Sequence, residues 1–140
     1  MQHKIKYFFL NKFSIDDILD FIKTRNYFFQ LIDSKTIVSE VQVINAINKT
    51  LRYINNNNRF KYPGNLLLLY LSYSDQISTA IEKVGIKNST VNGIVIYENN
   101  NDFMEFSELN GVNIIDRNIP YDSSDDFNVF SKMSYIDFLL

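Results

Sequence analysis

The segment that decides the predicted fold is residues 65–87, NLLLLYLSYSDQISTAIEKVGIK. Its apolar run at residues 66–71 is typical of a strand covered on both faces. Ser72 and Asp75 then resemble a capping box, and Gly85 is a suitable C-terminal stop for the helix between them. One helical face of that stretch is apolar, with Ile77, Ala80, Ile81 and Val84. The segment therefore predicts a central strand followed by an amphipathic helix.

The residues before this segment predict two strands and two helices. Residues 4–10 and 28–32 are rich in aromatic and β-branched side chains, which favours strands. Between them, behind Ser14 as a possible N-cap, apolar residues recur at helical spacing. They are Ile15, Ile18, Leu19 and Ile22. Residues 39–54 carry a second helical stripe and are expected to form a helix lying on the sheet. That stripe is Val43, Ile44, Ile47, Leu51 and Ile54.

The residues after Gly85 predict one more buried strand and two helices. Residues 93–97 are the strand, a short helix is expected around Phe103 and Phe106, and residues 126–140 form a longer C-terminal helix. The expected fold class is therefore α+β, with mixed α/β content. We expect residues 1–140 to form a single domain, in which helices pack around a small central mixed β-sheet and a C-terminal helix completes the fold.

Composition fits one domain with a sizeable core, since the chain has 140 residues and is 46% apolar. The net charge is only −2, but it is unevenly distributed. Residues 1–97 hold twelve Lys and Arg against seven Asp and Glu, a net +5, whereas residues 98–140 have a net −7. A polyanionic partner would therefore be expected to meet the first part of the chain.

The sequence lacks the side chains that most catalytic sites need. It contains no cysteine and one histidine, His3, and its four glycines form neither a phosphate-binding loop nor a dinucleotide-binding motif. We therefore expect no enzyme activity, no ATP binding, no metal site and no cofactor. A small hydrolase or transferase using carboxylates is the least favoured alternative. Without cysteine, a signal-peptide core or an apolar stretch of spanning length, the expected location is the cytoplasm, with no membrane contact.

Two segments carry a resemblance to a known family. The first is residues 31–50, LIDSKTIVSEVQVINAINKT, with Asp33, the pair Ile37-Val38 and the pair Ala46-Ile47. The second is residues 65–87, whose matching positions are Ser72, Gln76-Ile77, Ala80-Ile81 and Gly85. In these segments, and more weakly across roughly residues 28–140, the chain resembles the family of the PRPK-binding protein, the kinase-binding subunit of the KEOPS complex.

The resemblance implies a non-catalytic subunit of the assembly that installs threonylcarbamoyl on the adenine beside the anticodon of tRNAs. Such a subunit binds the small kinase-like ATPase, and through it the threonylcarbamoyltransferase subunit, and recognises the 3′ CCA end of tRNA. The chain departs from the family pattern at Asn65, Asp75 and Gln42, where glutamate, arginine and histidine respectively are common. The missing arginine removes a positive charge beside the start of the helix that follows.

A basic and aromatic segment is the candidate RNA-binding site. One polar stripe, expected on the outer face of the helix at residues 39–54, contains Gln42, Asn45, Lys49 and Arg52. Cations and aromatic rings together suit single-stranded RNA, because rings stack on bases while cations meet phosphates. The predicted RNA-binding residues are Lys49, Arg52, Arg59, Phe60, Lys61 and Tyr62. The alternatives are a solvated helix face with aromatics folded onto the core, and a stand-alone single-stranded RNA-binding module.

The C-terminal helix is the candidate partner-binding element, because it has no wholly polar side. The predicted partner-binding stripe is Val129, Met133, Ile136 and Leu140. The predicted core side is Phe127, Phe130 and Phe138. On this assignment Met133→Asp weakens kinase binding and Phe130→Asp unfolds the domain. The alternatives are a helix buried on both sides and a terminal strand.

Overall fold

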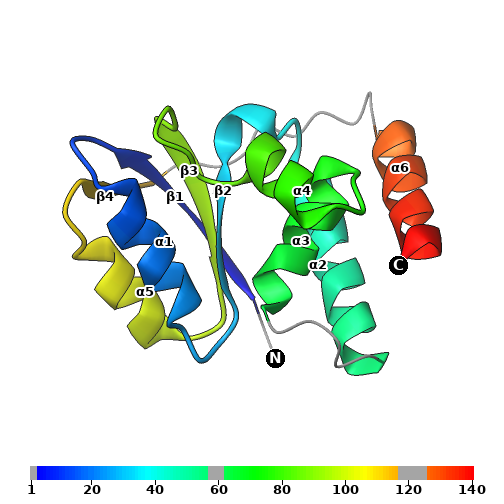
Figure 1. Cartoon of the computed structure of the whole chain (residues 1–140), viewed down its shortest axis with the longest axis horizontal. Coiled ribbons are helices and arrows are strands. Elements are labelled where there is room, and N and C mark those ends of the chain that lie inside the picture. Colours follow the sequence, from blue (N-terminus) through cyan, green and yellow to red (C-terminus); the bar gives the residue numbers. More distant parts are fainter. Residues whose placement is uncertain (1–2, 57–61, 117–125) are drawn as a thin grey trace. The chain divides into compact units, whose positions relative to one another are not determined.

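The computed structural model describes residues 3–56, 62–116 and 126–140, without the side chains of Asp126 and Phe127. The chain forms two compact units, residues 1–35 with 85–118 and residues 36–84 with 119–140. Figure 1 shows the strands in the first unit and a group of helices in the second. The predicted α+β class is confirmed, and the single domain stays a prediction. No helix in the described part of the chain is long and apolar enough to cross a membrane.

The first unit contains a four-stranded sheet in the order β2-β3-β1-β4. Its strands are β1 (Lys4–Leu10), β2 (Phe29–Asp33), β3 (Asn92–Tyr97) and β4 (Val112–Ile115). Three of them were predicted, whereas β4 was not, because four residues on a sheet edge carry little periodic signal. Every pair of neighbouring strands is antiparallel. The prediction of a mixed sheet is therefore wrong.

Two helices pack against this sheet, α1 (Ile15–Lys23) and α5 (Asn100–Ser107). The predicted cap is confirmed, since the Ser14 hydroxyl accepts a hydrogen bond from the Asp17 amide at 3.3 Å. Asn99 caps α5 in the same way, through the amides of Asn101 and Asp102. A short 3-10 helix, η1 (Ser34–Thr36), follows β2.

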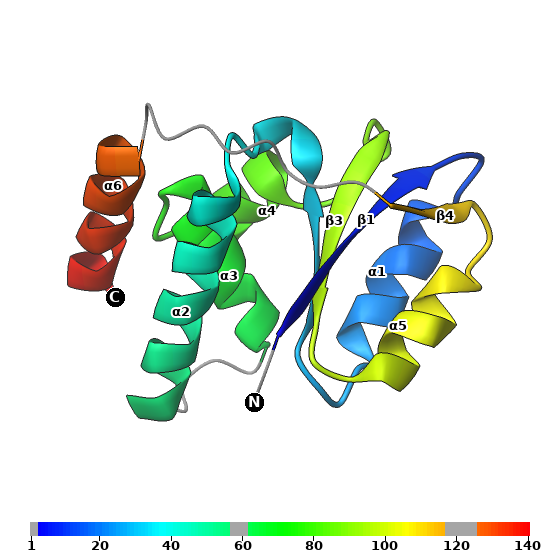
Figure 2. The ribbon, with the colours of Figure 1, turned by 180° about the vertical axis from the view of Figure 1, so that it is seen from behind.

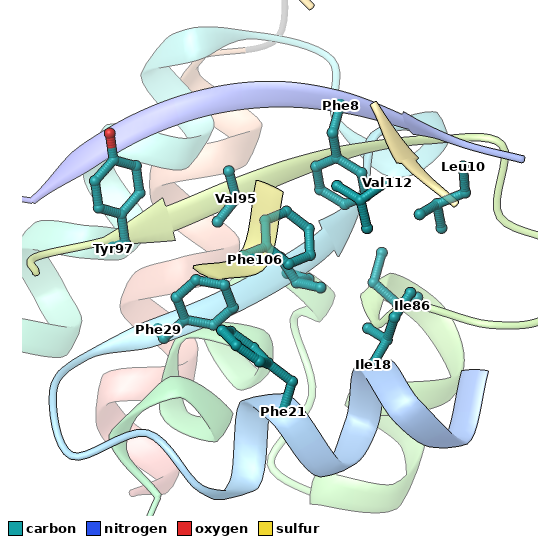
Figure 3. Close-up of a cluster of buried hydrophobic side chains, with 11 residues drawn as sticks. Phe8, Leu10, Ile18, Phe21, Phe29, Ile86, Val95, Tyr97, Phe106 and Val112 are labelled. Atoms are coloured by element: carbon teal, nitrogen blue, oxygen red, sulfur yellow. The ribbon is translucent and has the colours of Figure 1, made fainter. Parts of the chain in front are cut away.

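Aromatic rings form the centre of the core in the first unit. Phe106 of α5 meets Phe8 of β1 edge-on at 5.0 Å between ring centroids, and Phe29 of β2 at 5.4 Å. Phe21 of α1 packs edge-on against Phe29 at 5.2 Å (Figure 3). Edge-to-face contacts add to the free energy gained by burial, so this cluster fixes the two helices on the sheet.

Gly93 is required where β3 passes under a ring of β1. It lies opposite Phe8 in the antiparallel register, and a Cβ atom at Gly93 would come within 2.2 Å of the Phe8 Cζ atom. Phe8 is fully buried, so its ring has little room to move. We expect Gly93→Ala to lower the free energy of unfolding by about 1–3 kcal/mol, measured by chemical denaturation. In a Phe8→Leu background, Gly93→Ala should lower the free energy of unfolding by much less. An equal decrease in both backgrounds would contradict the steric explanation.

The described residues of the second unit form four α-helices, α2 (Glu40–Asn56), α3 (Pro63–Ser72), α4 (Ile77–Val84) and α6 (Asp126–Leu139). Helix α3 packs against α2 and α4, and α6 packs against α2 and α3. Figure 2 shows α6 running alongside α2. Helices α2, α4 and α6 were predicted, and the boundaries of α6 lie within one residue of the prediction, whereas α4 begins at Ile77 rather than directly after Ser72. Gly85 follows the last residue of α4, as expected.

Helix α3 replaces the predicted central strand. Residues 66–71 are buried on all sides, as expected, but in a helix. The run contains leucine and tyrosine and no β-branched residue, and leucine is a strong helix former. Pro63 in the first turn favours a helix start. The predicted capping box is also wrong, because Ser72 is the last residue of α3, and the Ser74 hydroxyl instead accepts from the Gln76 amide at 3.1 Å.

Candidate functional site

Helix α6 presents one face to its own unit. Val129, Met133 and Ile136 each have at most 1% of their surface exposed. The Met133 Sδ atom accepts a hydrogen bond from the Asn45 side-chain amide of α2 at 3.2 Å. These residues are four and three positions apart, which places them on one side of a helix. The stripe therefore fastens α6 to the helices of the second unit.

A polar contact reinforces this attachment. The Asp137 carboxylate accepts hydrogen bonds from the Lys49 ammonium of α2, at 2.5 Å, and from the Tyr70 hydroxyl of α3. Burial, followed by the hydrogen bond to Asp137, raises the pKa of Tyr70 above its ordinary value. Tyr70 therefore stays protonated as a donor. Sequence reasoning missed this contact. The available signal was that Asp137 is the only acidic residue between positions 127 and 140, in an otherwise largely apolar helix.

The predicted faces of α6 are reversed in the structure. Val129, Met133 and Ile136 are buried rather than available to a partner, and Leu140 is half-buried. Phe130 and Phe138, predicted to face the core, are 42% and 84% exposed. The side chain of Phe127 lies outside the described residues. Periodicity could not choose between two apolar faces, whereas the contacts of Asn45 and Asp137 fix the rotation of the helix.

The exposed side of α6 is the candidate interaction surface, which we call the α6 outer face. We define it by the exposed apolar and aromatic side chains of the helix, Phe130, Tyr135, Phe138 and Leu139. Each of these side chains is at least 40% exposed. Exposed apolar and aromatic side chains grouped on one helix are typical of protein–protein interfaces. Such a surface is expected to meet a protein partner, because burying these rings removes apolar surface from water.

A hollow of about 480 Å³ adjoins this face, lined by Ser72, Tyr73, Lys83, Ser131, Lys132 and Tyr135. The Lys132 ammonium lies 5.2 Å from the centre of the Tyr73 ring, within range of a cation–π contact. Tyr73 follows α3 in the left-handed conformation, with φ 57° and ψ 38°. Sequence reasoning did not group these residues, because they come from three separate helices and the turn after α3.

The structure describes three of the six predicted RNA-binding residues, Lys49, Arg52 and Tyr62. Arg59, Phe60 and Lys61 lie outside the described residues. Arg52 and Tyr62 are exposed, whereas Lys49 is paired with Asp137. The predicted outer position of the polar stripe is wrong for three of its members. Gln42 is buried and accepts a hydrogen bond from the Val38 amide, and Asn45 and Lys49 bond to α6.

The side chains of Asp33 and His3 are both buried in the first unit. Asp33 is buried at the end of β2, where it accepts hydrogen bonds from the Thr90 hydroxyl and the Lys35 amide, both at 3.0 Å. His3, the single histidine, has a buried side chain, with its Nε2 atom 3.9 Å from the Glu98 carboxylate. Burial lowers the pKa of His3. The described residues include no cluster of three or more His, Cys, Asp or Glu that could hold a metal ion.

Comparison with known proteins gives one family match. A search of curated proteins found no match. Residues 11–134 match the protein family described as kinase binding protein CGI-121. The match covers most of the first unit and most of the second, including α6 as far as its Met133 contact. The chain therefore belongs to the kinase binding protein CGI-121 family.

Proposed function

We propose that the chain is a non-catalytic subunit of the KEOPS complex and that it binds the complex's small kinase subunit through the α6 outer face. The observation that carries the interface is the apolar side of α6 that its own unit leaves uncovered, with Phe138 84% exposed. The family description supplies the class of partner. Through the kinase, the chain would be joined to the threonylcarbamoyltransferase subunit.

The rigid attachment of α6 supports this role. Because Met133 and Asp137 hold the helix on α2 and α3, the outer face is already ordered before a partner arrives. A preordered surface loses less conformational entropy on binding than a disordered one. Aromatic side chains at such a surface commonly supply much of the binding free energy. The chain's contribution to the modification reaction is then positioning of its partners, while the chemistry belongs to other subunits.

The kinase assignment is tested by co-expression with the small kinase subunit of the same organism. We expect a tag on the kinase to retain the chain at a one-to-one ratio through gel filtration. If the chain elutes alone but still binds single-stranded RNA, the stand-alone RNA-binding module is the better description. A chain that hydrolyses ATP without the kinase would contradict the non-catalytic role.

We also include the 3′ CCA end of tRNA among the proposed partners. The residues proposed for this contact are Arg52, Arg59, Phe60, Lys61 and Tyr62. We leave Lys49 out, because its ammonium is paired with Asp137. Arg52 and Tyr62 flank residues 57–61, so the sequence gathers cations and rings around one segment. Such a mixture favours single-stranded RNA, through phosphate contacts and base stacking.

The RNA contact predicts a distinctive dependence on salt. We expect weak binding to tRNA, with Arg52→Gln flattening the slope of log affinity against log salt by about 0.7. Tyr62→Ala should cost about 1–3 kcal/mol and leave that slope nearly unchanged, because stacking involves no counterion release. Both are measured by fluorescence anisotropy at several salt concentrations. Equal binding to tRNA lacking its CCA end would contradict the proposed contact.

A further inference from the structure

Among the described residues, the hollow beside the α6 outer face is lined by two cations and no carboxylate. Lys83 comes from α4 and Lys132 from α6, and the other lining side chains are serines and tyrosines. Neither lysine forms an ion pair within residues 3–56, 62–116 and 126–140. Lysine, serine and tyrosine side chains all donate hydrogen bonds. The hollow is therefore suited to an anionic group.

The backbone beneath the hollow is held in an unusual conformation. Tyr73 has a positive φ of 57°, a region that glycine and asparagine occupy readily and that bulky side chains seldom occupy. This conformation accompanies a Tyr73 ring that lines the hollow and lies 5.2 Å from the Lys132 ammonium. The Tyr73 ring and the Lys132 ammonium therefore lie together in the lining of the hollow. Strained positions of this kind cluster at binding sites, where the surroundings maintain them.

From these observations we infer that the hollow receives the carboxylate of an acidic side chain from the protein that docks on the α6 outer face. This inference rests on the proposed function and names the chemistry of the partner at that surface. A protein carboxylate is favoured over an RNA phosphate because Tyr135 belongs to both features, so the hollow is continuous with an apolar surface. Lys83 and Lys132 supply the complementary charge. The anchor fixes the position of the partner along α6, and the apolar contacts supply most of the affinity.

The test uses charge reversal at the two lysines. The variants Lys83→Glu and Lys132→Glu are titrated with the cognate small kinase subunit by calorimetry at low and high salt. We expect each variant to weaken binding by about tenfold or more at low salt, because like charges then face each other across the interface. The loss should shrink at high salt, where the repulsion is screened. Lys35→Glu, an exposed lysine of η1 in the first unit, is the matched control and should bind as the wild type does.

A second variant examines the strained tyrosine. Tyr73→Asn keeps a residue that tolerates the left-handed conformation and removes the ring. We expect it to weaken kinase binding by about tenfold, with the ordinary thermal unfolding of the second unit retained. A kinase variant in which one acidic residue is changed to lysine should restore binding to Lys132→Glu, which identifies the anchoring carboxylate directly.

Three results would overturn this inference, and each leaves the proposed function in a different position. If Lys83→Glu and Lys132→Glu bind the kinase normally while Phe138→Asp does not, the docking surface stands and the anchor is wrong. If none of the three variants affects binding, both the docking surface and the anchoring site are wrong. If the lysine variants lose affinity for a single-stranded oligoribonucleotide ending in CCA and retain the kinase, the hollow is an RNA site.

Discussion

Met133→Asp is expected to unfold the second unit or to destabilise it severely. Met133 is fully buried, and its Sδ atom contacts the Asn45 side chain of α2. A carboxylate at this position would be buried without a cationic partner, and an uncompensated buried charge commonly costs about 3–5 kcal/mol or more. The measurement is thermal and chemical unfolding of the free chain, followed by circular dichroism.

Met133→Leu is the control for this prediction, because it preserves volume and should cost less than about 1.5 kcal/mol. The expectation reverses the assignment made from the sequence, in which Met133→Asp left the chain folded and Phe130→Asp unfolded it. Phe130→Asp should now unfold at nearly the wild-type temperature, since the Phe130 side chain is 42% exposed. A Met133→Asp chain with wild-type stability would show that α6 does not pack as described.

Phe138→Asp is expected to abolish most of the affinity for the kinase and to leave folding unchanged. The side chain is 84% exposed, so its replacement removes almost no contact within the free chain. In a docked complex, however, the aspartate would be desolvated against an apolar surface. Loss of a central aromatic contact typically costs at least about 2 kcal/mol, which corresponds to roughly 30-fold in the dissociation constant. Calorimetric titration with the small kinase subunit measures this loss.

The matched control for Phe138→Asp is Met104→Asp. Met104 is an apolar helical residue with 57% of its surface exposed, but it belongs to α5 in the first unit. The Met104→Asp variant should have the unfolding temperature and the kinase affinity of the wild-type chain. If the two variants weaken kinase binding equally, the α6 outer face is not the interface and an added negative charge explains the effect.

Most elements were predicted because their signals are local. The strand at Lys4–Leu10 and the helix behind Ser14 follow from side-chain type and capping within a few residues. The strand predicted at residues 66–71 was wrong, because complete burial removes the periodicity that distinguishes a strand from a helix. Their leucine content and Pro63 were the signals available for the correct assignment. The sheet therefore does not contain residues 66–71, and all of its neighbouring strands are antiparallel.

The orientation of α6 could not be predicted, because distant residues determine it. Asp137 bonds to Lys49 and Tyr70, which lie 88 and 67 positions away in the sequence. On the helix itself both faces are apolar, so residue spacing fits either rotation. The same long-range contact removed Lys49 from the candidate RNA site. Local patterns predicted the helix but assigned its buried face to the outside.

The most direct test of the central claim is calorimetric titration of the wild-type chain with its cognate small kinase subunit at several temperatures. We expect one-to-one binding with a negative heat-capacity change, because docking on the α6 outer face removes apolar surface from water. Phe138→Asp should eliminate most of this signal. Absence of binding to the kinase, or wild-type binding and heat-capacity change in Phe138→Asp, would contradict the account.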